Sequence, residues 1–396
     1  MAVSLADYVG REQAYVKHVF LQEYLEALIH KTASTYPHIV IVDGFAGPWQ
    51  SANEKFEDTS FGVALAALRS AKESWKKNGR TVKMSAYLVE RDAKAYAKLA
   101  TISPKYPDVA IKTYPADFLA VLPQILADIP KDAFVLFLID PKGWRIPLKS
   151  LQPMLSRPGS EIIFNFMFDF INRAASIDDP LIIAGLDKLI PFGDWRAKLR
   201  KAQDDAGGSL TSEARKNILV SAFNDSLAQL GDYKYVAETT VLRPLKDRPL
   251  YCLCYATRHP RGIEVFRDCQ VKALREQASA RASAKVKHAA ATTGQNELFE
   301  SLHDMGPDKL DATLKGELAA ARQLLLELAP TPPASVKYED LWPQILKSHI
   351  VRRTEVNALA AELRKSEDLL FPDWEQGKRV PQAHYKVQRA PKRDLL

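Results

Sequence analysis

Four acidic residues stand at or just beyond the ends of predicted strands, which makes them the side chains of this chain best placed to bind a ligand. They are Asp43, Glu90, Asp117 and Asp140. Helical patterns separate the strands, so the strands should be parallel and their carboxyl ends should meet at one edge of a sheet. Acids also follow strands in order to cap the next helix, which is the alternative for each residue taken singly.

The glycine turn after the first of these strands indicates which class of cofactor could bind there. The apolar run ending at Asp43 opens into Gly44-Phe45-Ala46-Gly47-Pro48, where Gly44 and Gly47 allow the backbone to approach a ligand closely. The turn has neither a G-x-x-x-x-G-K-[ST] phosphate loop nor a full G-x-G-x-x-G dinucleotide fingerprint. Asp43 would repel a phosphate and attract an ammonium or sulfonium group. The turn therefore favours a cationic, phosphate-free cofactor such as S-adenosylmethionine.

The other acids have expected roles around such a cofactor. Glu90 is placed to accept hydrogen bonds from both hydroxyls of a ribose, and Asp117 is placed to accept one from an adenine amine, with Phe118 beside it covering the ring. Asp140 and the carbonyl of Pro141 are adjacent acceptors that can hold an exocyclic amine while its lone pair attacks a methyl group.

Trp144 closes the same segment, Asp140-Pro141-Lys142-Gly143-Trp144. Its ring can stack on a flat base, a contact worth roughly 1–3 kcal/mol. The alternative is a simple chain reversal in which Pro141 and Gly143 turn the backbone and Trp144 fills the core. For this segment we favour the functional interpretation, in which Trp144 stacks on a base.

Alternating strand and helix patterns predict a doubly wound, Rossmann-like α/β sheet. Strand patterns fall at 40–43, 84–90, 109–114, 133–140 and 161–166, and they return at 233–241 and at 250–257, continuing through 262–265. The polar, helical stretch between the two groups predicts an insertion. The expected domains are 1–171 with 231–275 as the α/β domain, and 172–230 as a helical insertion.

The last part of the chain predicts a helical linker region at 276–333 and a winged-helix-like domain at 334–396. Two helices, near 338–347 and 354–367 with Thr354 as a helix cap, precede two strands near 370–374 and 384–388. Candidates for nucleic-acid contacts in this domain are Arg352, Arg353, Asn357 and Arg364.

Composition places the 396-residue chain among ordinary globular proteins, with 46% hydrophobic and 26% charged residues. It has no apolar run of roughly 18 residues and no secretory signal pattern, so a cytoplasmic protein is expected. Cys252, Cys254 and Cys269 lack metal-type spacing and are expected to be buried, reduced thiols. No metal site is predicted.

The net charge of +7 favours an anionic partner such as nucleic acid, and a solvated basic face is the alternative. One basic tract comprises Lys272, Arg275, Arg281, Lys285 and Lys287.

These motifs together resemble the three-Cys-motif partner protein family, whose members resemble class I S-adenosylmethionine-dependent methyltransferases. The resemblance rests on the glycine turn, Val89-Glu90-Arg91-Asp92, the Asp140–Trp144 segment, Asn172-Arg173 and Thr257-Arg258-His259-Pro260-Arg261-Gly262, and it spans roughly residues 10–270. It implies a cofactor pocket formed by Asp43, Gly44, Phe45, Gly47, Glu90 and Asp117, and a reactive edge at Asp140–Trp144. It also implies a companion protein, which carries the three cysteines of the family name.

The resulting hypothesis is a methyltransferase that acts on nucleic acid with that companion. Lys142 and the position of Trp144 depart from the D-P-P-[YF] pattern of amino-methyltransferases. The alternative is a methyltransferase-like binding or scaffold protein without turnover, and a Mg²⁺-dependent nuclease is a third, less favoured hypothesis. Arg173 is expected to hold either a phosphate or a structural carboxylate. His259–Gly262 is expected to be a turn, with an antiparallel hairpin as the alternative. Lys17 and His18 of the first helix are expected on a solvated face, and the alternative is that they face the cofactor.

Overall fold

The computed structural model describes residues 8, 12–47, 51, 56–293 and 300–391. Pro48 of the glycine turn and the side chain of Lys287 lie outside the described part. The chain divides into two compact units, Met1–Arg258 and His259–Leu396. The expected boundary at 275/276 therefore falls within the second unit and inside a helix.

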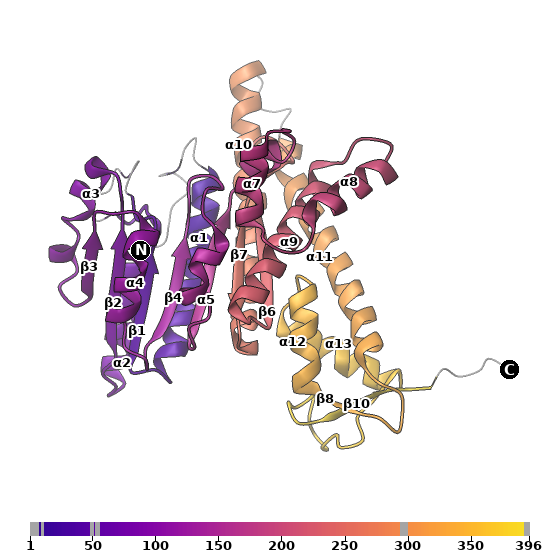
Figure 1. The fold of residues 1–396 in the computed structure, drawn as a ribbon. Coiled ribbons are helices and arrows are strands. Elements are labelled where there is room, and N and C mark those ends of the chain that lie inside the picture. Colours follow the sequence, from indigo (N-terminus) through magenta and orange to yellow (C-terminus); the bar gives the residue numbers. More distant parts are fainter. Residues whose placement is uncertain (1–7, 9–11, 48–50, 52–55, 294–299, 392–396) are drawn as a thin grey trace. The chain divides into compact units, whose positions relative to one another are not determined.

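A seven-stranded sheet organises the N-terminal unit (Figure 1). Its order is β3-β2-β1-β4-β5-β7-β6. Strands β1 to β5 are parallel, and β7 runs antiparallel to both β5 and β6. The strands are β1 (His38–Asp43), β2 (Lys83–Val89), β3 (Ala110–Tyr114), β4 (Phe134–Ile139), β5 (Ser160–Phe166), β6 (Tyr235–Leu242) and β7 (Pro249–Thr257). The strand patterns of the sequence thus predicted the sheet.

Helices cover both faces of this sheet because its central strands are apolar on both sides. The helices are α1 (Glu12–Ala33), α2 (Ser60–Lys77), α3 (Ala93–Leu99), α4 (Phe118–Asp128), α5 (Gln152–Leu155), α6 (Phe168–Ala174), α7 (Pro180–Leu189), α8 (Trp195–Asp205) and α9 (Ser212–Gly231), with short 3₁₀ turns η2 (Ser103–Lys105) and η3 (Leu148–Leu151). Helices α1 and α2 contact each other and β1. The core on the opposite side joins α4 to α9 with alternate residues of the strands, such as Val40 and Val42.

Two sequence predictions about the segments next to the last strands of this sheet are wrong. Helix α9 packs on β6 and β7 and contributes Leu219 and Phe223 to the core, so the stretch 172–230 contains a covering helix of the sheet and is not a separate insertion. The expected strand continuation at 262–265 is helical, because α10 (Pro260–Thr293) begins directly after β7. Proline fits the first turn of a helix, so Pro260–Gly262 belong to the first turn of α10, and the alternative of a hairpin at His259–Gly262 is wrong.

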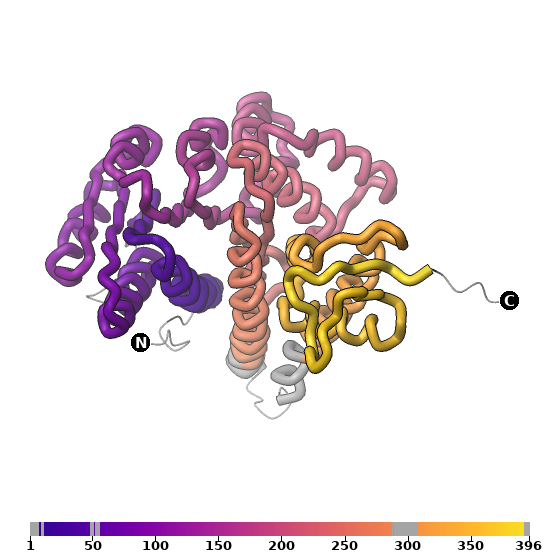
Figure 2. Tube along the Cα trace, turned by 90° about the horizontal axis from the view of Figure 1, so that it is seen from below, coloured from indigo at the N-terminus to yellow at the C-terminus, as the bar shows by residue number. Residues whose placement is uncertain are grey.

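The C-terminal unit consists of helices and a small antiparallel sheet, and its trace runs from orange to yellow in Figure 2. Its remaining helices are α11 (Glu300–Leu328), α12 (Tyr338–Ser348) and α13 (Arg353–Lys365), and its strands are β8 (Val336–Lys337), β9 (Leu369–Leu370) and β10 (Lys386–Arg389). Strand β10 lies between β8 and β9. The two helices followed by paired strands agree with the predicted order, with β8 as an unforeseen third strand. Arg352, with Glu355, caps α13 in place of Thr354.

The three cysteines are free and buried, as expected from their apolar surroundings. Burial raises the pKa of the Cys252 thiol to about 12. None of the described helices combines the length and apolarity needed to cross a membrane.

Candidate cofactor site at the carboxyl edge of the sheet

The glycine turn lies where the strand order of the parallel sheet changes direction. From β1 the chain adds β2 and β3 on one side, and it then returns to place β4 and β5 on the other side. Ligands of open α/β sheets bind beyond the carboxyl ends of strands at such a switch point. The backbone N–H of Gly44 donates to Leu138 O at 3.0 Å, and that of Ala46 donates to Val89 O at 2.8 Å. The turn is therefore fixed between the ends of β2 and β4.

The Asp43 carboxylate stabilises this turn through hydrogen bonds. The Asp43 side chain is buried, with the backbone N–H of Phe45 donating to Oδ1 at 2.9 Å and the hydroxyl of Ser60 donating to Oδ2 at 3.0 Å. Burial raises the pKa of Asp43 to about 6, and the two hydrogen bonds oppose that rise. Ser60 begins α2, so Asp43 joins the end of β1 to the start of the next helix.

Asp140 lies just after β4, on the other side of the switch point. Lys17 Nζ donates to its Oδ2 at 2.9 Å, and Asn165 Nδ2 donates to its Oδ1. Lys17 comes from α1 and Asn165 from β5, so three elements converge on one carboxylate. The Asp140 side chain keeps 34% of its surface exposed, which leaves it accessible to a ligand.

The expected solvated face of α1 is a wrong prediction. The Lys17 side chain is only 17% exposed and faces Asp140. His18 is buried, and its Nδ1 lies 2.9 Å from the hydroxyl of Tyr8. Helix α1 packs along α2 and the sheet, which encloses the part of the helix that carries these two side chains.

Glu90 and Asp117 each use one carboxylate oxygen to order the chain around them. The Oε1 of buried Glu90 accepts from the backbone N–H of Asp92 at 2.7 Å. The Oδ1 of Asp117 accepts from Leu119 N at 3.0 Å and caps α4, and Oδ2 lies 3.8 Å from Arg91. The capping alternative is therefore present at Asp117, and its second oxygen faces the surface.

Phe118 forms the floor under the glycine turn. The ring is buried and its centroid lies 6.0 Å from that of Phe45. A Cβ added at Gly44 would lie 3.0 Å from the Phe118 ring, so the backbone passes closely over this ring. Phe118 therefore lies against the glycine turn, and its expected role of covering an adenine ring stays a prediction.

Trp144 is packed on one side and open on the other. Its ring centroid lies 4.9 Å from that of Phe170, and a Cβ added at Gly185 of α7 would lie 2.9 Å from its Nε1. A hollow of about 340 Å³ lies beside the ring. Its lining comprises Trp144, Arg145, Pro147, Leu181, Ile182, Gly185 and Lys188. Pro141 is buried, and Gly143 has a φ of +99°, which produces the sharp turn between Asp140 and Trp144.

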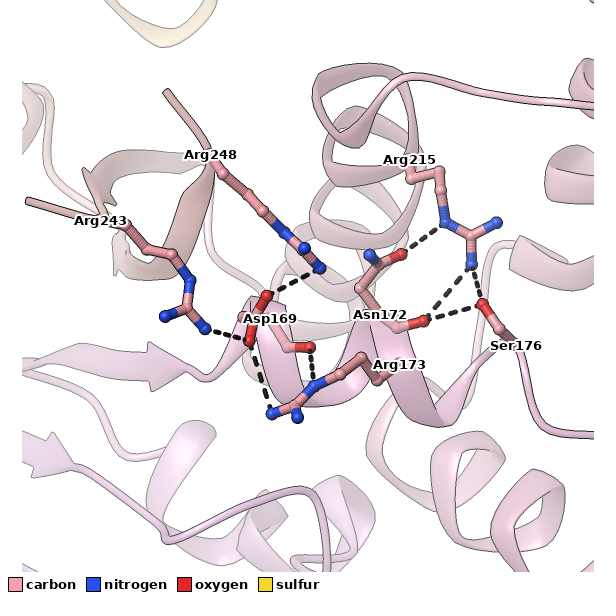
Figure 3. Close-up of polar contacts among 7 residues, drawn as sticks. All are labelled: Asp169, Asn172, Arg173, Ser176, Arg215, Arg243 and Arg248. Atoms are coloured by element: carbon pink, nitrogen blue, oxygen red, sulfur yellow. Dashed lines mark hydrogen bonds and ion pairs between the residues drawn. The ribbon is translucent and has the colours of Figure 1, made fainter. Parts of the chain in front are cut away.

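Of the two expectations for Arg173, the contact with a structural carboxylate is present in the structure, and a contact with a phosphate stays a prediction. Arg173 Nη2 lies 3.4 Å from Asp169 of the same helix, α6 (Figure 3). Arg243 and Arg248 reach the same carboxylate, and Asn172 accepts a hydrogen bond from Arg215.

All four candidate nucleic-acid residues contact other side chains of the C-terminal unit. Arg352 pairs with Glu355 at 2.8 Å. Arg353 pairs with Glu264 at 3.2 Å and lies over the Trp342 ring at 4.4 Å. Asn357 Oδ1 accepts from the Tyr338 hydroxyl at 2.7 Å, and Arg364 lies over Trp374 at 4.3 Å. These contacts give each residue a role in packing or capping, and a nucleic-acid role stays a prediction.

Two site residues, Ser60 and Asn165, were missed by the sequence analysis, and Lys17 was assigned to a solvated face, with a position facing the cofactor only as the alternative. Asn165 had a usable signal, because it is polar within the otherwise apolar run Ile162-Ile163-Phe164-Asn165-Phe166. Lys17 and Ser60 reach the site from α1 and α2, and only the packing of these helices shows it. The described residues hold no cluster of histidine, cysteine and acidic side chains suited to a metal ion.

The sheet defines the class of fold. A seven-stranded mixed sheet of this order, with β7 antiparallel beside β5, is typical of the methyltransferase Rossmann fold. No protein-family model and no curated protein matches the chain.

Three solved structures with 8–13% identity are similar to parts of the chain. Protein LPL1258 from Legionella pneumophila has 12% identity and a TM-score of 0.36, over 67% of this chain and 91% of its own. A loganic acid methyltransferase with S-adenosylhomocysteine has 8% identity and a TM-score of 0.31, over 75% of this chain and 88% of its own. The YcgJ protein from Bacillus subtilis has 13% identity and a TM-score of 0.24, over 59% of this chain and 98% of its own.

Proposed function

We propose that the N-terminal unit binds S-adenosylmethionine and that the protein is a methyltransferase acting on nucleic acid. The observation that supports the cofactor is the placement of Asp43 and Asp140 on either side of the β1/β4 switch point, with the glycine turn between β2 and β4. With Glu90, these acids place three carboxylates at this edge of the sheet, and the Lys17 ammonium pairs with that of Asp140. A negative site with a close-approaching backbone suits a cationic cofactor and disfavours a pyrophosphate.

In this proposal the chain holds the cofactor at three places. The second oxygen of Glu90 accepts from the ribose, Asp117 accepts from the adenine amine beyond its capping bond, and the Gly44–Gly47 backbone approaches the amino-acid part. Phe118 supports that backbone from below. When bound, S-adenosylmethionine supplies a methyl group on a sulfonium, which is already a good leaving group.

Asp140 is the proposed catalytic residue. Lys17 and Asn165 fix its carboxylate from two sides, which positions it to accept a hydrogen bond from the substrate amine together with the carbonyl of Pro141. Catalysis would then consist mainly of orienting the attacking nitrogen. Trp144 would stack on the target base, and a duplex target would have to be flipped.

The partner proposals rest on the family resemblance. We expect a companion three-Cys-motif protein and a winged-helix-like C-terminal unit that presents nucleic acid. A scaffold without turnover is the second candidate, and one observation favours it: both oxygens of Asp140 already accept from Lys17 and Asn165.

Asp140→Ala separates the two candidates. We expect the variant to lose transfer of a labelled methyl group to nucleic acid, measured with the companion protein present, while its affinity for S-adenosylmethionine changes by less than about threefold, because Asp140 acts on the substrate. Asp128→Ala, at the far end of α4 and paired with Lys112, is the matched control. Full methylation by Asp140→Ala would overturn the catalytic assignment. Cofactor binding with no methylation by the unmodified protein would favour the scaffold.

A further inference from the structure

Three arginines surround the single carboxylate of Asp169 in the N-terminal unit (Figure 3). Arg243 Nη2 lies 2.7 Å from Oδ2, Arg248 Nη2 lies 3.0 Å from Oδ1, and Arg173 Nη2 lies 3.4 Å from Oδ2. We call these four residues the arginine cluster. Asp169 is 6% exposed, whereas the arginine side chains are 39–63% exposed. The carboxylate is therefore the inner member, and the guanidinium groups reach the surface.

The arginine cluster belongs to the edge of the sheet that carries the proposed reactive site. Asp169 and Arg173 lie on α6, which follows the carboxyl end of β5. Arg243 and Arg248 are the first and last residues of the loop that connects β6 to β7, and Arg243 N donates to Arg248 O at 2.9 Å. Strand β6 runs in the same direction as β5, because both are antiparallel to β7. The hairpin therefore leaves the sheet at the edge where Asp140 ends β4.

The arginine cluster contains three cationic side chains and one acidic side chain. Three guanidinium groups meet one carboxylate, and in the hairpin itself Lys246 and Asp247 contribute opposite charges. A single arginine would suffice to pair a buried acid, and each added cation repels the others. Arg248 Nε is in addition buried without a hydrogen-bond partner in the structure. An anion bound between the guanidinium groups would relieve this repulsion.

Aromatic rings connect the arginine cluster to the Asp140–Trp144 segment. The Arg173 guanidinium lies over the Phe170 ring at 5.6 Å, and Phe170 contacts Trp144 with ring centroids 4.9 Å apart. Phe170 is 43% exposed although it is a large apolar residue. Exposed aromatic rings beside arginines are the usual surface for single-stranded nucleic acid, because bases stack on the rings and phosphates pair with the cations.

We propose that the arginine cluster binds a backbone phosphate of a single-stranded nucleic acid, with a neighbouring base stacked on Phe170 and Trp144. Arginine suits this ligand because its planar guanidinium can form two parallel hydrogen bonds to one phosphate. The inference deepens the proposed function and rests on it for the role of the bound strand as substrate. The binding itself requires no cofactor.

The test is fluorescence anisotropy of labelled single-stranded DNA and RNA of mixed sequence with the full-length protein. We expect Arg173→Ala and Arg248→Ala to weaken binding about tenfold each and to lower the slope of log affinity against log salt by about one per lost phosphate contact. Arg248→Lys should retain much of the affinity, and Asp169→Asn should tighten binding because it removes the competing carboxylate. Comparison of the DNA and RNA probes shows which of the two nucleic acids binds more tightly.

Arg69→Ala is the matched control, because Arg69 forms an ion pair of similar length, 2.9 Å, with Asp108 at another part of the same unit. It should bind as the unmodified protein does. Thermal unfolding of each variant confirms that it is folded. Equal affinity of Arg173→Ala, Arg248→Ala and the control would overturn the inference, and so would competition by polyglutamate at the same charge concentration as the oligonucleotide.

A parallel titration with S-adenosylmethionine keeps the two proposals separate. Arginine-dependent oligonucleotide binding without cofactor binding would contradict the proposed function and support the arginine cluster. Cofactor binding without oligonucleotide binding would contradict the arginine cluster alone.

Discussion

Asp43 and Asp140 end neighbouring parallel strands, yet their surroundings give them different properties. Asp43 is buried, holds the turn through Phe45 N–H and Ser60, and has a pKa raised to about 6 by burial. Asp140 is partly exposed and is held by Lys17 and Asn165. The inner acid therefore shapes the backbone, and the outer acid faces the place where a substrate would react.

The raised pKa of Asp43 has a consequence for stability. The folded state holds its proton up to a higher pH than the unfolded state, whose pKa stays near 3.8. The free energy of unfolding should therefore fall by about 3 kcal/mol from this group as pH rises from about 4 to about 6, and then level off.

Asp43→Asn should remove this contribution, because an amide does not titrate and can still accept from Phe45 N–H. We expect the difference in unfolding free energy between the two proteins, measured by urea denaturation, to change by about 3 kcal/mol between pH 4 and pH 7. Glu161, whose pKa burial also raises, is common to both proteins and cancels. A constant difference across this range would contradict the assignment.

At the scale of the element, the start of α4 combines a helix cap with a proposed cofactor contact. Asp117 Oδ1 accepts from Leu119 N, so Asp117→Ala should cost about 1 kcal/mol of stability. Asp117→Asn should keep the cap, because asparagine is a good capping residue, but its remaining amide group cannot accept from an adenine amine.

We therefore expect both variants to bind S-adenosylmethionine more weakly, and only Asp117→Ala to be less stable. Calorimetric titration and thermal unfolding of the two variants measure these effects separately. Unchanged cofactor affinity in both would leave Asp117 with its capping role alone.

The elements predicted from the sequence are those whose local pattern and packing agree. The parallel strands were predicted because their apolar runs end in acids or turns, and β4 shows this most clearly in Phe134–Ile139. The site acids followed from the strands, because parallel strands place their carboxyl ends at one edge. The start of α10 was missed because Gly262, Ile263 and Val265 continue the apolar character of β7, although Pro260 fits a first helical turn.

The residues that the sequence did not reveal act across elements. Lys17 reaches Asp140 over a separation of 123 residues, and the three partners of Asp169 come from α6 and from the β6–β7 hairpin. No local spacing encodes these contacts, since each depends on how a helix or hairpin packs against the sheet.

At the scale of the whole molecule, the basic charge is used differently in the two units. Arg352, Arg353 and Arg364 of the C-terminal unit pair with acids or lie over tryptophan rings. The arginine cluster of the N-terminal unit sets three cations against one acid. A net charge of +7 alone did not distinguish these uses.

Each unit has a hydrophobic core of its own, so we expect calorimetric unfolding to depart from a single two-state transition.

Substitutions in the two units should act on separate transitions. Gly62→Ala should lower the transition temperature of the N-terminal unit, because a Cβ there would lie 1.8 Å from the carbonyl oxygen of Phe56. Trp342→Ala should lower the other transition by removing a buried ring, at a cost of about 3–5 kcal/mol. A single transition that both substitutions lower alike would contradict this expectation.

The measurement that tests the central claim most directly is calorimetric titration of the full-length protein with S-adenosylmethionine and with S-adenosylhomocysteine. We predict one binding site in the unmodified protein and in the Asp128→Ala control, and loss of binding in Asp43→Ala, with folding of each variant verified by circular dichroism. Absence of binding at millimolar cofactor, or binding by Asp43→Ala equal to that of the unmodified protein, would contradict a cofactor site at the β1/β4 switch point.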